Sequence, residues 1–179
     1  MICSAALWEL AYLKRNFRYA TMETKLTAYK SLVRPTLEYA SVVWDPFTKD
    51  HNLQIEKLQN GALRFVFSRY GRAESVSDMR RQANLQSLDV RRRMNKLKQF
   101  FRIYHKKLNI DTSLYCKRNV SRSSSLYHSE SVSPYFCRID VFNYSFFPAT
   151  ISQWNRLPNA IVSCENVDAF MCEVEKISV

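Results

Sequence analysis

The sequence predicts a mainly α-helical fold: a helical bundle over residues 1–110, a serine-rich linker over 111–134, and a small C-terminal appendage over 135–179. The first indication is the scarcity of glycine. The 179 residues contain only Gly61 and Gly71, where average usage would give about twelve. Because β-sandwiches and barrels use glycine at turns and bulges, this shortage favours helices. The second indication is a 46% hydrophobic content, much of it spaced three and four residues apart, which is the period of a helix packed on one face.

The first 46 residues are expected to be helical. Apolar residues at helical spacing predict a first helix over residues 4–19. Thr21 is the expected N-cap of a second helix, because its hydroxyl can accept a hydrogen bond from a free N–H of the first turn. Pro35 must interrupt that helix or open a new one in its first turn. We therefore expect two helices joined at a proline corner, with Asp45-Pro46 closing the segment.

The next helix carries an apolar stripe from residue 55 to residue 66. Thr48 or Asp50 is its expected cap. Gly61 lies inside the stripe, at a cost of about 1 kcal/mol relative to alanine. Gly71 lies where the C-terminal cap of a helix is expected, since glycine readily adopts a left-handed conformation.

Two further helices are predicted before residue 109. A short one starts at Ser75 or Ser77 and runs to about Ala83. The most regular element begins at Ser87 and continues for about twenty residues, with cations covering most of its outer surface. Its apolar stripe consists of Val90, Met94, Leu97, Phe101, Tyr104 and Leu108.

The character of the chain changes from Asn109 onward. Residues 117–134 are rich in serine and have no periodicity, which predicts a mobile loop or linker. Alternating apolar and polar residues over 137–146 predict a short extended segment. Pro148 is expected to open a small helix through Trp154, and a last helix is expected around residues 167–177.

Positive charge is concentrated in one part of the chain. The net charge is +11, and residues 61–108 carry thirteen Lys or Arg and three acidic residues. Such a field suits a polyanion, most often nucleic acid, and a solvated helical surface is the alternative. Tyr70 and Phe100 lie among the cations, where a ring can stack on bases, although core packing is favoured for Phe100. The residues expected to contact phosphates are Arg91, Arg92, Lys96, Arg102 and Lys106, followed by Arg64, Arg69, Arg80 and Arg81.

The sequence contains no pattern of an enzyme site. Phosphate-binding loops and nucleophile elbows require glycines that the chain lacks. No Asp-Asp pair supports two-metal chemistry, and the five cysteines form no C-x-x-C pair for zinc. No catalytic residue, metal or cofactor is therefore expected. The absence of a signal peptide and of a long apolar run predicts a soluble, intracellular protein with free thiols, in the nucleus or the cytoplasm.

Four blocks of the chain resemble one family of proteins in the same order. Residues 25–46 read KLTAYKSLVRPTLEYASVVWDP, residues 55–66 IEKLQNGALRFV, residues 85–93 LQSLDVRRR, and residues 146–158 FFPATISQWNRLP. These blocks are similar to the segment that follows the polymerase palm in non-LTR (LINE-type, jockey-like and CR1-like) retrotransposon reverse transcriptases. Gly61 and Ala149 depart from the family pattern, which usually has a helix-favouring charged or polar residue and an arginine at these positions.

The resemblance implies that the chain is the thumb and C-terminal region of such a reverse transcriptase. In that family the thumb is a helical bundle that follows the template–primer duplex. The palm with its catalytic aspartates and the endonuclease precede the matched region, so the resemblance implies no polymerase activity for this fragment. It also implies that Trp44 and the pair Trp154-Asn155 are architectural.

Two functions follow as expectations. The first is a non-catalytic fragment of an RNA-directed DNA polymerase whose basic helical surface binds an RNA/DNA template–primer duplex. That binding would be sensitive to salt and have little sequence specificity. The alternative is a self-associating or protein-interaction module with exposed apolar faces on the first helix (Leu7, Leu10, Leu13) and over residues 39–44.

Overall fold

The computed structural model describes residues 2–118 and 128–178. These residues are mainly helical, as predicted, and contain no strand beyond an isolated bridge between Arg118 and Val132. The contacts divide the chain into two compact units, residues 1–92 and 93–179. The division lies inside one helix, α7 (Leu88–Tyr104). It differs from the expected boundary at residue 110 because aromatic residues of this helix pack against the C-terminal helices.

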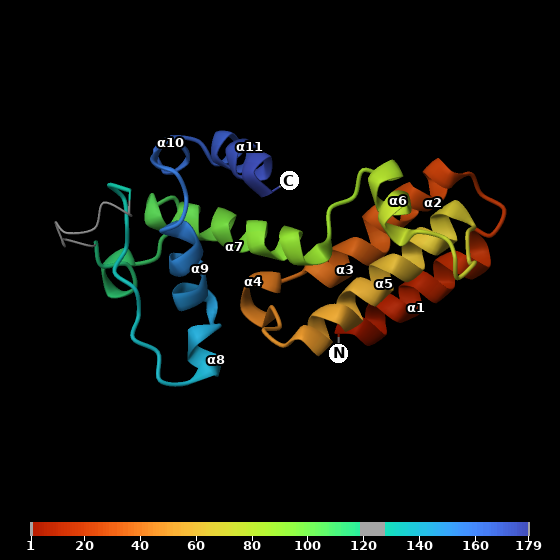
Figure 1. Ribbon diagram of the computed structural model, residues 1–179, viewed down its shortest axis with the longest axis horizontal. Coiled ribbons are helices and arrows are strands. Elements are labelled where there is room, and N and C mark those ends of the chain that lie inside the picture. The colour runs from red at the N-terminus through yellow and green to blue at the C-terminus, as the bar shows by residue number, and fades with distance from the viewer. Residues whose placement is uncertain (1, 119–127, 179) are drawn as a thin grey trace. The chain divides into compact units, whose positions relative to one another are not determined.

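The first unit is built from helices that lie side by side (Figure 1). It contains α1 (Ile2–Asn16), α2 (Met22–Ala28), the π-helical turn η1 (Tyr29–Val33), α3 (Arg34–Glu38), α4 (Ser41–Trp44), α5 (Lys49–Phe67), α6 (Val76–Gln82) and the start of α7. The core side chains come from α1, from the middle segment formed by α2, η1 and α3, and from α5. Leu13 of α1, Val33 of the middle segment and Leu63 of α5 are each at most 1% exposed.

Hydroxyl caps start three of these helices, as the sequence predicts. The Thr21 side chain accepts from the backbone N–H of Thr24 over 3.3 Å. Ser75 accepts from the N–H of Asp78 over 3.3 Å, and Ser87 accepts from the N–H of Val90 over the same distance. Each bond satisfies one of the first-turn donors that have no partner inside the helix.

Pro35 lies in the first turn of a new helix, α3, which confirms one of the two expectations for it. The expected corner at Pro35 is wrong, because the backbone keeps right-handed helical angles through Val33 and Arg34. The preceding turn is π-helical, and the N–H of Arg34 donates to the carbonyl of Tyr29. The chain instead turns after α3, where Ala40 has a left-handed φ of 50°.

The two glycines have lesser roles than expected. Gly71 does not cap α5, because the helix ends at Phe67 and Ser68 takes the left-handed position with φ of 54°. The hydroxyl of Ser68 accepts a hydrogen bond from Lys25 Nζ over 2.9 Å. A Cβ added to Gly61 would lie 3.8 Å from Leu10 Cδ2, an ordinary van der Waals distance. The packing of α1 on α5 therefore tolerates glycine there and does not require it.

The second unit is organised around aromatic rings. After α7 it contains the 3-10 turn η2 (Thr112–Leu114), α8 (Asp140–Asn143), α9 (Phe146–Trp154), α10 (Asn159–Val162) and α11 (Val167–Ser178). The ring centroids of Phe100 and Trp154 are 5.2 Å apart, and those of Phe101 and Phe170 are 4.5 Å apart. All four side chains are fully buried. Phe100 is thus a core residue.

Trp154 and Asn155 attach the end of the serine-rich stretch to this core. The Asn155 amide accepts from the N–H of Val132 over 2.9 Å and donates to its carbonyl over 2.7 Å. Trp154 Nε1 donates to the carbonyl of Glu130 over 3.0 Å. A free linker is therefore the wrong description of residues 128–133, and residues 119–127 of the predicted linker lie outside the described residues.

Two further predictions for the second unit need correction. The extended segment over 137–146 is wrong, because residues 140–143 form α8 and α9 already begins at Phe146. The long helix ends at Tyr104, four residues before the expected Leu108. Lys106 has a left-handed φ of 52°, which ends the helical path. The predicted last helix is confirmed as α11. Within the described residues, no helix combines the length and the hydropathy needed to cross a membrane.

Candidate nucleic-acid interface

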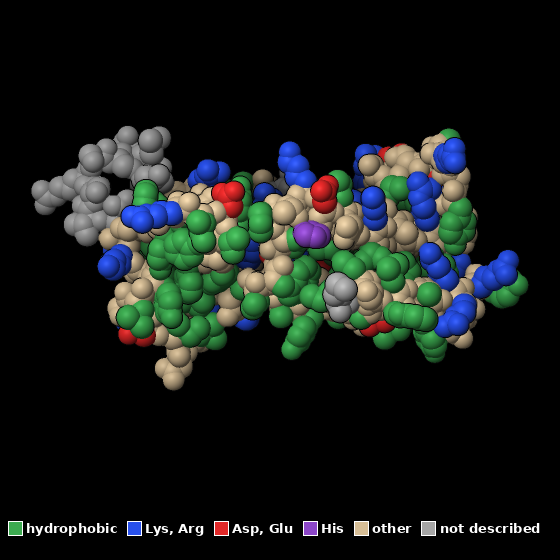
Figure 2. Space-filling model, turned by 90° about the horizontal axis from the view of Figure 1, so that it is seen from below, with side chains coloured by type: hydrophobic (Ala, Val, Ile, Leu, Met, Phe, Trp, Pro, Cys, Tyr) green, Lys and Arg blue, Asp and Glu red, His purple; other side chains and the backbone are tan. Residues whose placement is uncertain are grey.

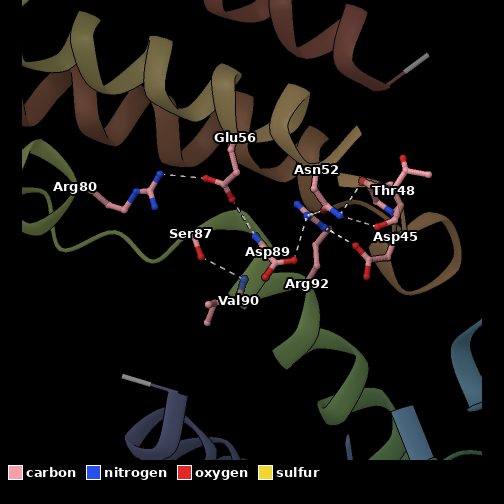
Figure 3. A network of polar contacts seen from close by, with 10 residues as sticks. Asp45, Thr48, Asn52, Glu56, Arg80, Ser87, Asp89, Val90 and Arg92 are labelled. Carbon is pink, nitrogen blue, oxygen red and sulfur yellow. Dashed lines mark hydrogen bonds and ion pairs between the residues drawn. The ribbon is translucent and has the colours of Figure 1, made fainter. Parts of the chain in front are cut away.

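Arg92, a predicted phosphate contact, is a buried structural residue. Its side chain is 0% exposed, and Nε donates to Asp45 Oδ1 over 2.6 Å. Its Nη2 donates to Asn52 Oδ1 over 2.5 Å and lies 3.8 Å from Asp89 Oδ1. Figure 3 shows the guanidinium directed toward Asp45 and Asn52. The prediction for Arg92 is wrong because a side chain enclosed in this way cannot reach a phosphate.

Arg91 and Arg80 are also held by carboxylates of the first unit. Arg91 forms a bidentate ion pair with Glu38, in which Arg91 Nη2 lies 2.9 Å from Glu38 Oε2. Arg80 Nη2 contacts Glu56 Oε2 at 3.1 Å and Asn60 Oδ1 at 3.0 Å. Both side chains are about 30% exposed or less. Their assignment as phosphate contacts is therefore corrected, since a carboxylate already occupies each guanidinium.

The remaining predicted cations differ in how much surface they offer. Lys96 is only 6% exposed, which leaves little of it for a ligand. Arg102 is half-buried, whereas Lys106 is exposed beyond the end of α7. The side chain of Arg81 is 81% exposed and forms a surface pair with Asp78 at 3.3 Å. For Arg102, Lys106 and Arg81, phosphate contact remains a prediction.

Lys and Arg side chains gather where α1 and α5 end. Arg64, in the last turn of α5, is half-buried and donates to the carbonyl of Gly71 over 2.9 Å, whereas Arg69 is exposed just beyond the helix. The bond from Lys25 to Ser68 ties the end of α5 to α2, which directly follows α1. Lys and Arg side chains are prominent over this end of the first unit, at the right in Figure 2. We call this surface the basic end. It consists of Lys14, Arg15, Arg18, Arg64, Arg69 and Arg72.

The basic end has two features that suit nucleic acid. Only Glu23 and Glu74 are acidic nearby in the sequence, and Glu74 lies 4.0 Å from Arg69. Tyr19 is 92% exposed, with the guanidinium of Arg18 5.6 Å from its ring centroid. Exposed rings beside cations can stack on bases while the cations bind phosphates.

Sequence reasoning selected only part of this surface. It chose Arg64, Arg69 and Tyr70, and Tyr70 is 62% exposed as stacking requires. It missed the cations of the first helix, because the charge of residues 1–60 is nearly balanced. The adjacent pair Lys14-Arg15 in the last turn of α1 was the signal that could have found them.

A cavity of about 310 Å³ lies beside the end of α7. The Tyr104 hydroxyl donates to Glu130 Oε2 over 2.7 Å, and Arg118 Nη2 donates to the same oxygen over 2.8 Å. Burial and the Glu130 carboxylate raise the pKa of Tyr104 to about 12. Burial raises the pKa of the Cys116 thiol to about 11 and, with the Lys107 charge, lowers the pKa of His105.

These shifts define the chemistry that the cavity offers at neutral pH. The Cys116 thiol stays protonated and is a poor nucleophile. His105 is neutral, and Tyr104 keeps its proton. Within the described residues, no group of three His, Cys, Asp or Glu side chains has the arrangement of a metal site. The groups around this cavity are suited to hydrogen bonding.

Comparison of the chain with protein-family models, curated proteins and solved structures found no match.

Proposed function

We propose that this chain is a non-catalytic fragment of a retrotransposon RNA-directed DNA polymerase that binds template–primer nucleic acid. The basic end is the proposed binding surface. Sequence blocks similar to the family, in the family order, support the fragment assignment. The observation that carries the binding assignment is the gathering of cations from α1, α5 and the loop after α5 at one end of the first unit.

The chemistry of the basic end accounts for binding without strict sequence preference. Lys and Arg side chains on a surface neutralise phosphates and release condensed counterions, whatever the base sequence. Tyr19 and Tyr70 offer ring faces beside these cations, and every base can stack on a ring. The contribution of Arg91, Arg92 and Arg80 is indirect, because their ion pairs hold α7 and α6 to the segments that carry Glu38, Asp45 and Glu56.

The test is equilibrium binding of a labelled RNA–DNA hybrid to the full chain at about 0.1 M salt. The double variant Arg69→Ala/Arg72→Ala removes two exposed cations of the basic end. We expect about a five- to tenfold loss of affinity per cation from the lost counterion release. The variant Arg69→Lys/Arg72→Lys, which keeps both charges, should retain most of the affinity.

The matched control removes two exposed cations of α5 that lie outside the basic end. Lys49 and Lys57 of α5 are both exposed, so Lys49→Ala/Lys57→Ala is expected to change affinity by less than about twofold. Equal losses in the two double variants would contradict a localised site at the basic end. No hybrid binding by the unmodified chain would refute the proposed function.

A second candidate is self-association through the outer face of α1. Leu7 is 54%, Trp8 74% and Tyr12 52% exposed. Two residues expected on this face are corrected, because Leu10 is 3% and Leu13 0% exposed and both pack in the core. Large apolar side chains exposed next to one another on a helix are typical of a docking surface.

Sedimentation over a range of protein concentrations tests this candidate. Self-association through α1 predicts that Trp8→Lys lowers the average mass toward that of a monomer. A chain that is monomeric at every concentration would contradict it. The second expected apolar face, over residues 39–44, includes exposed Tyr39 and Val43, at 79% and 86%, so Val43→Lys serves as a second variant.

A further inference from the structure

Exposed aromatic rings are concentrated in a short part of the second unit. Phe136 is 84%, Phe142 41% and Tyr115 41% exposed. Figure 2 shows hydrophobic side chains gathered over a broad area on the left of the molecule. A soluble chain rarely leaves so many large apolar side chains together on its surface unless they bind something.

Four aromatic side chains of this part, Tyr115, Tyr135, Phe142 and Phe147, are held by contacts with one another. Tyr115 and Phe147 stack with centroids 4.6 Å apart and ring planes 3° from parallel. Tyr135 meets Phe142 edge-on, with centroids 5.8 Å apart. The Tyr135 hydroxyl donates to the carbonyl of Tyr115 over 2.8 Å. Such contacts restrict ring motion, so binding a flat ligand would require little further ordering.

Cations accompany these rings. The guanidinium of Arg138 lies 6.0 Å from the ring centroid of Phe136. Among the described residues, no carboxylate forms an ion pair with Arg138. Lys117 is exposed, and its carbonyl accepts from the N–H of Ser133 over 2.8 Å, which places it beside the segment leading to Tyr135. The surface therefore offers ring faces and positive charge together.

We propose that this aromatic surface binds single-stranded nucleic acid. We define the aromatic surface as Tyr115, Lys117, Tyr135, Phe136, Arg138, Phe142 and Phe147. Bases stack on Phe136 and Phe142, and Arg138 and Lys117 contact the phosphates that connect them. Duplex bases are already stacked on each other, so this mode selects unpaired nucleotides. The proposal rests on the proposed function only in taking nucleic acid as the class of partner.

The charge and ring content favour nucleic acid over a protein partner. A cation held over an exposed ring places a phosphate contact next to a stacking face, which a single strand needs at every nucleotide. Two aliphatic residues, Ile139 and Val141, are also exposed in this segment, at 65% and 68%. They provide a built-in control, because an apolar protein contact would use them and base stacking would not.

The test compares three probes on the full chain by fluorescence anisotropy. The probes are a labelled 12-nucleotide oligodeoxythymidine, an abasic strand with the same number of phosphates, and the RNA–DNA hybrid. The variant Phe136→Leu/Phe142→Leu keeps apolar side chains and removes the rings. We expect oligodeoxythymidine affinity to fall by about 5- to 150-fold for each lost stack, while hybrid affinity changes by less than about twofold.

The control variant Ile139→Ser/Val141→Ser should leave oligodeoxythymidine affinity unchanged. Equal binding of the abasic and normal strands would overturn the inference, as would full affinity in the leucine variant. Loss of oligodeoxythymidine affinity in the serine variant alone would overturn it in favour of an aliphatic contact. Hybrid binding without oligodeoxythymidine binding would overturn this inference and leave the proposed function standing. The reverse result would refute the proposed duplex binding and keep this inference.

Discussion

Replacement of Arg92 by alanine separates a structural arginine from a phosphate contact. The charge pattern of the sequence places Arg92 on an open cationic surface, where its loss would weaken hybrid binding and leave stability unchanged. In the structure its guanidinium is enclosed and donates to Asp45 and Asn52 over 2.6 and 2.5 Å. We therefore expect Arg92→Ala to destabilise the first unit and to affect binding only through that loss.

The expected magnitude follows from burial on the two sides of the pair. Removing one partner of a buried ion pair typically costs about 3–5 kcal/mol, because the other charge loses its partner. The Asp45 side chain is 16% exposed and can be rehydrated in part, so the loss should lie near the lower end, about 3 kcal/mol. For comparison, Arg81→Ala breaks a pair whose side chains are 81% and 53% exposed, and we expect a loss of less than about 1 kcal/mol.

Urea unfolding followed by far-UV circular dichroism measures the free energy of unfolding of each variant. Native-state hydrogen exchange in α5 and α6 assigns the loss to the first unit. The double variant Arg92→Met/Asp45→Leu should recover most of the stability, because two apolar side chains replace two charges together. A loss below about 1 kcal/mol in Arg92→Ala, accompanied by tenfold weaker hybrid binding, would refute this reasoning.

Three further changes test other parts of the structure. Gly61→Ala should raise the free energy of unfolding by about 0.5–1 kcal/mol, because alanine favours a helix more than glycine does and the added Cβ fits, at 3.8 Å from Leu10 Cδ2. A lower free energy of unfolding in urea would mean that the contact of α1 with α5 requires glycine at this position. Asn155→Leu should lower the free energy of unfolding by about 2–4 kcal/mol, because the buried N–H and carbonyl of Val132 lose their hydrogen-bond partners. An unchanged hydrogen-exchange rate at the Val132 amide would contradict this prediction. Burial lowers the pKa of His105, so below pH 6.5 the unfolded chain binds more protons and stability falls as pH falls. His105→Gln should reduce that fall between pH 7 and 5 in urea unfolding, and an identical pH dependence would contradict the assignment.

Local patterns in the sequence predicted much of the helical framework. Hydroxyl side chains at Thr21, Ser75 and Ser87 start helices because an N-cap is a contact over three residues. The last helix, α11, was predicted from the spacing of its apolar residues, a signal that lies entirely within the helix itself. The alternation over residues 137–146 led to a wrong prediction. Four of its apolar residues, Ile139, Val141, Phe142 and Tyr144, remain exposed, and residues 140–143 form a short helix with no buried residue.

The cations were misassigned because their partners lie far away in the sequence. Arg91 pairs with Glu38, Arg92 with Asp45 and Arg80 with Glu56, at separations of 24 to 53 residues. A charge count over residues 61–108 contains none of these three carboxylates. Local charge therefore predicted that nucleic acid is a fitting partner, but it could not distinguish exposed cations from paired ones.

The salt dependence of hybrid binding tests the proposed function most directly. The affinity of the full chain for an RNA–DNA hybrid is measured from about 50 to 300 mM salt, for the unmodified chain and for Arg69→Ala/Arg72→Ala. We expect log K to fall linearly with log salt, and the slope to decrease by about 0.9 for each cation removed from the basic end. An affinity that does not change with salt, or the same slope in both proteins, would contradict phosphate binding at this surface.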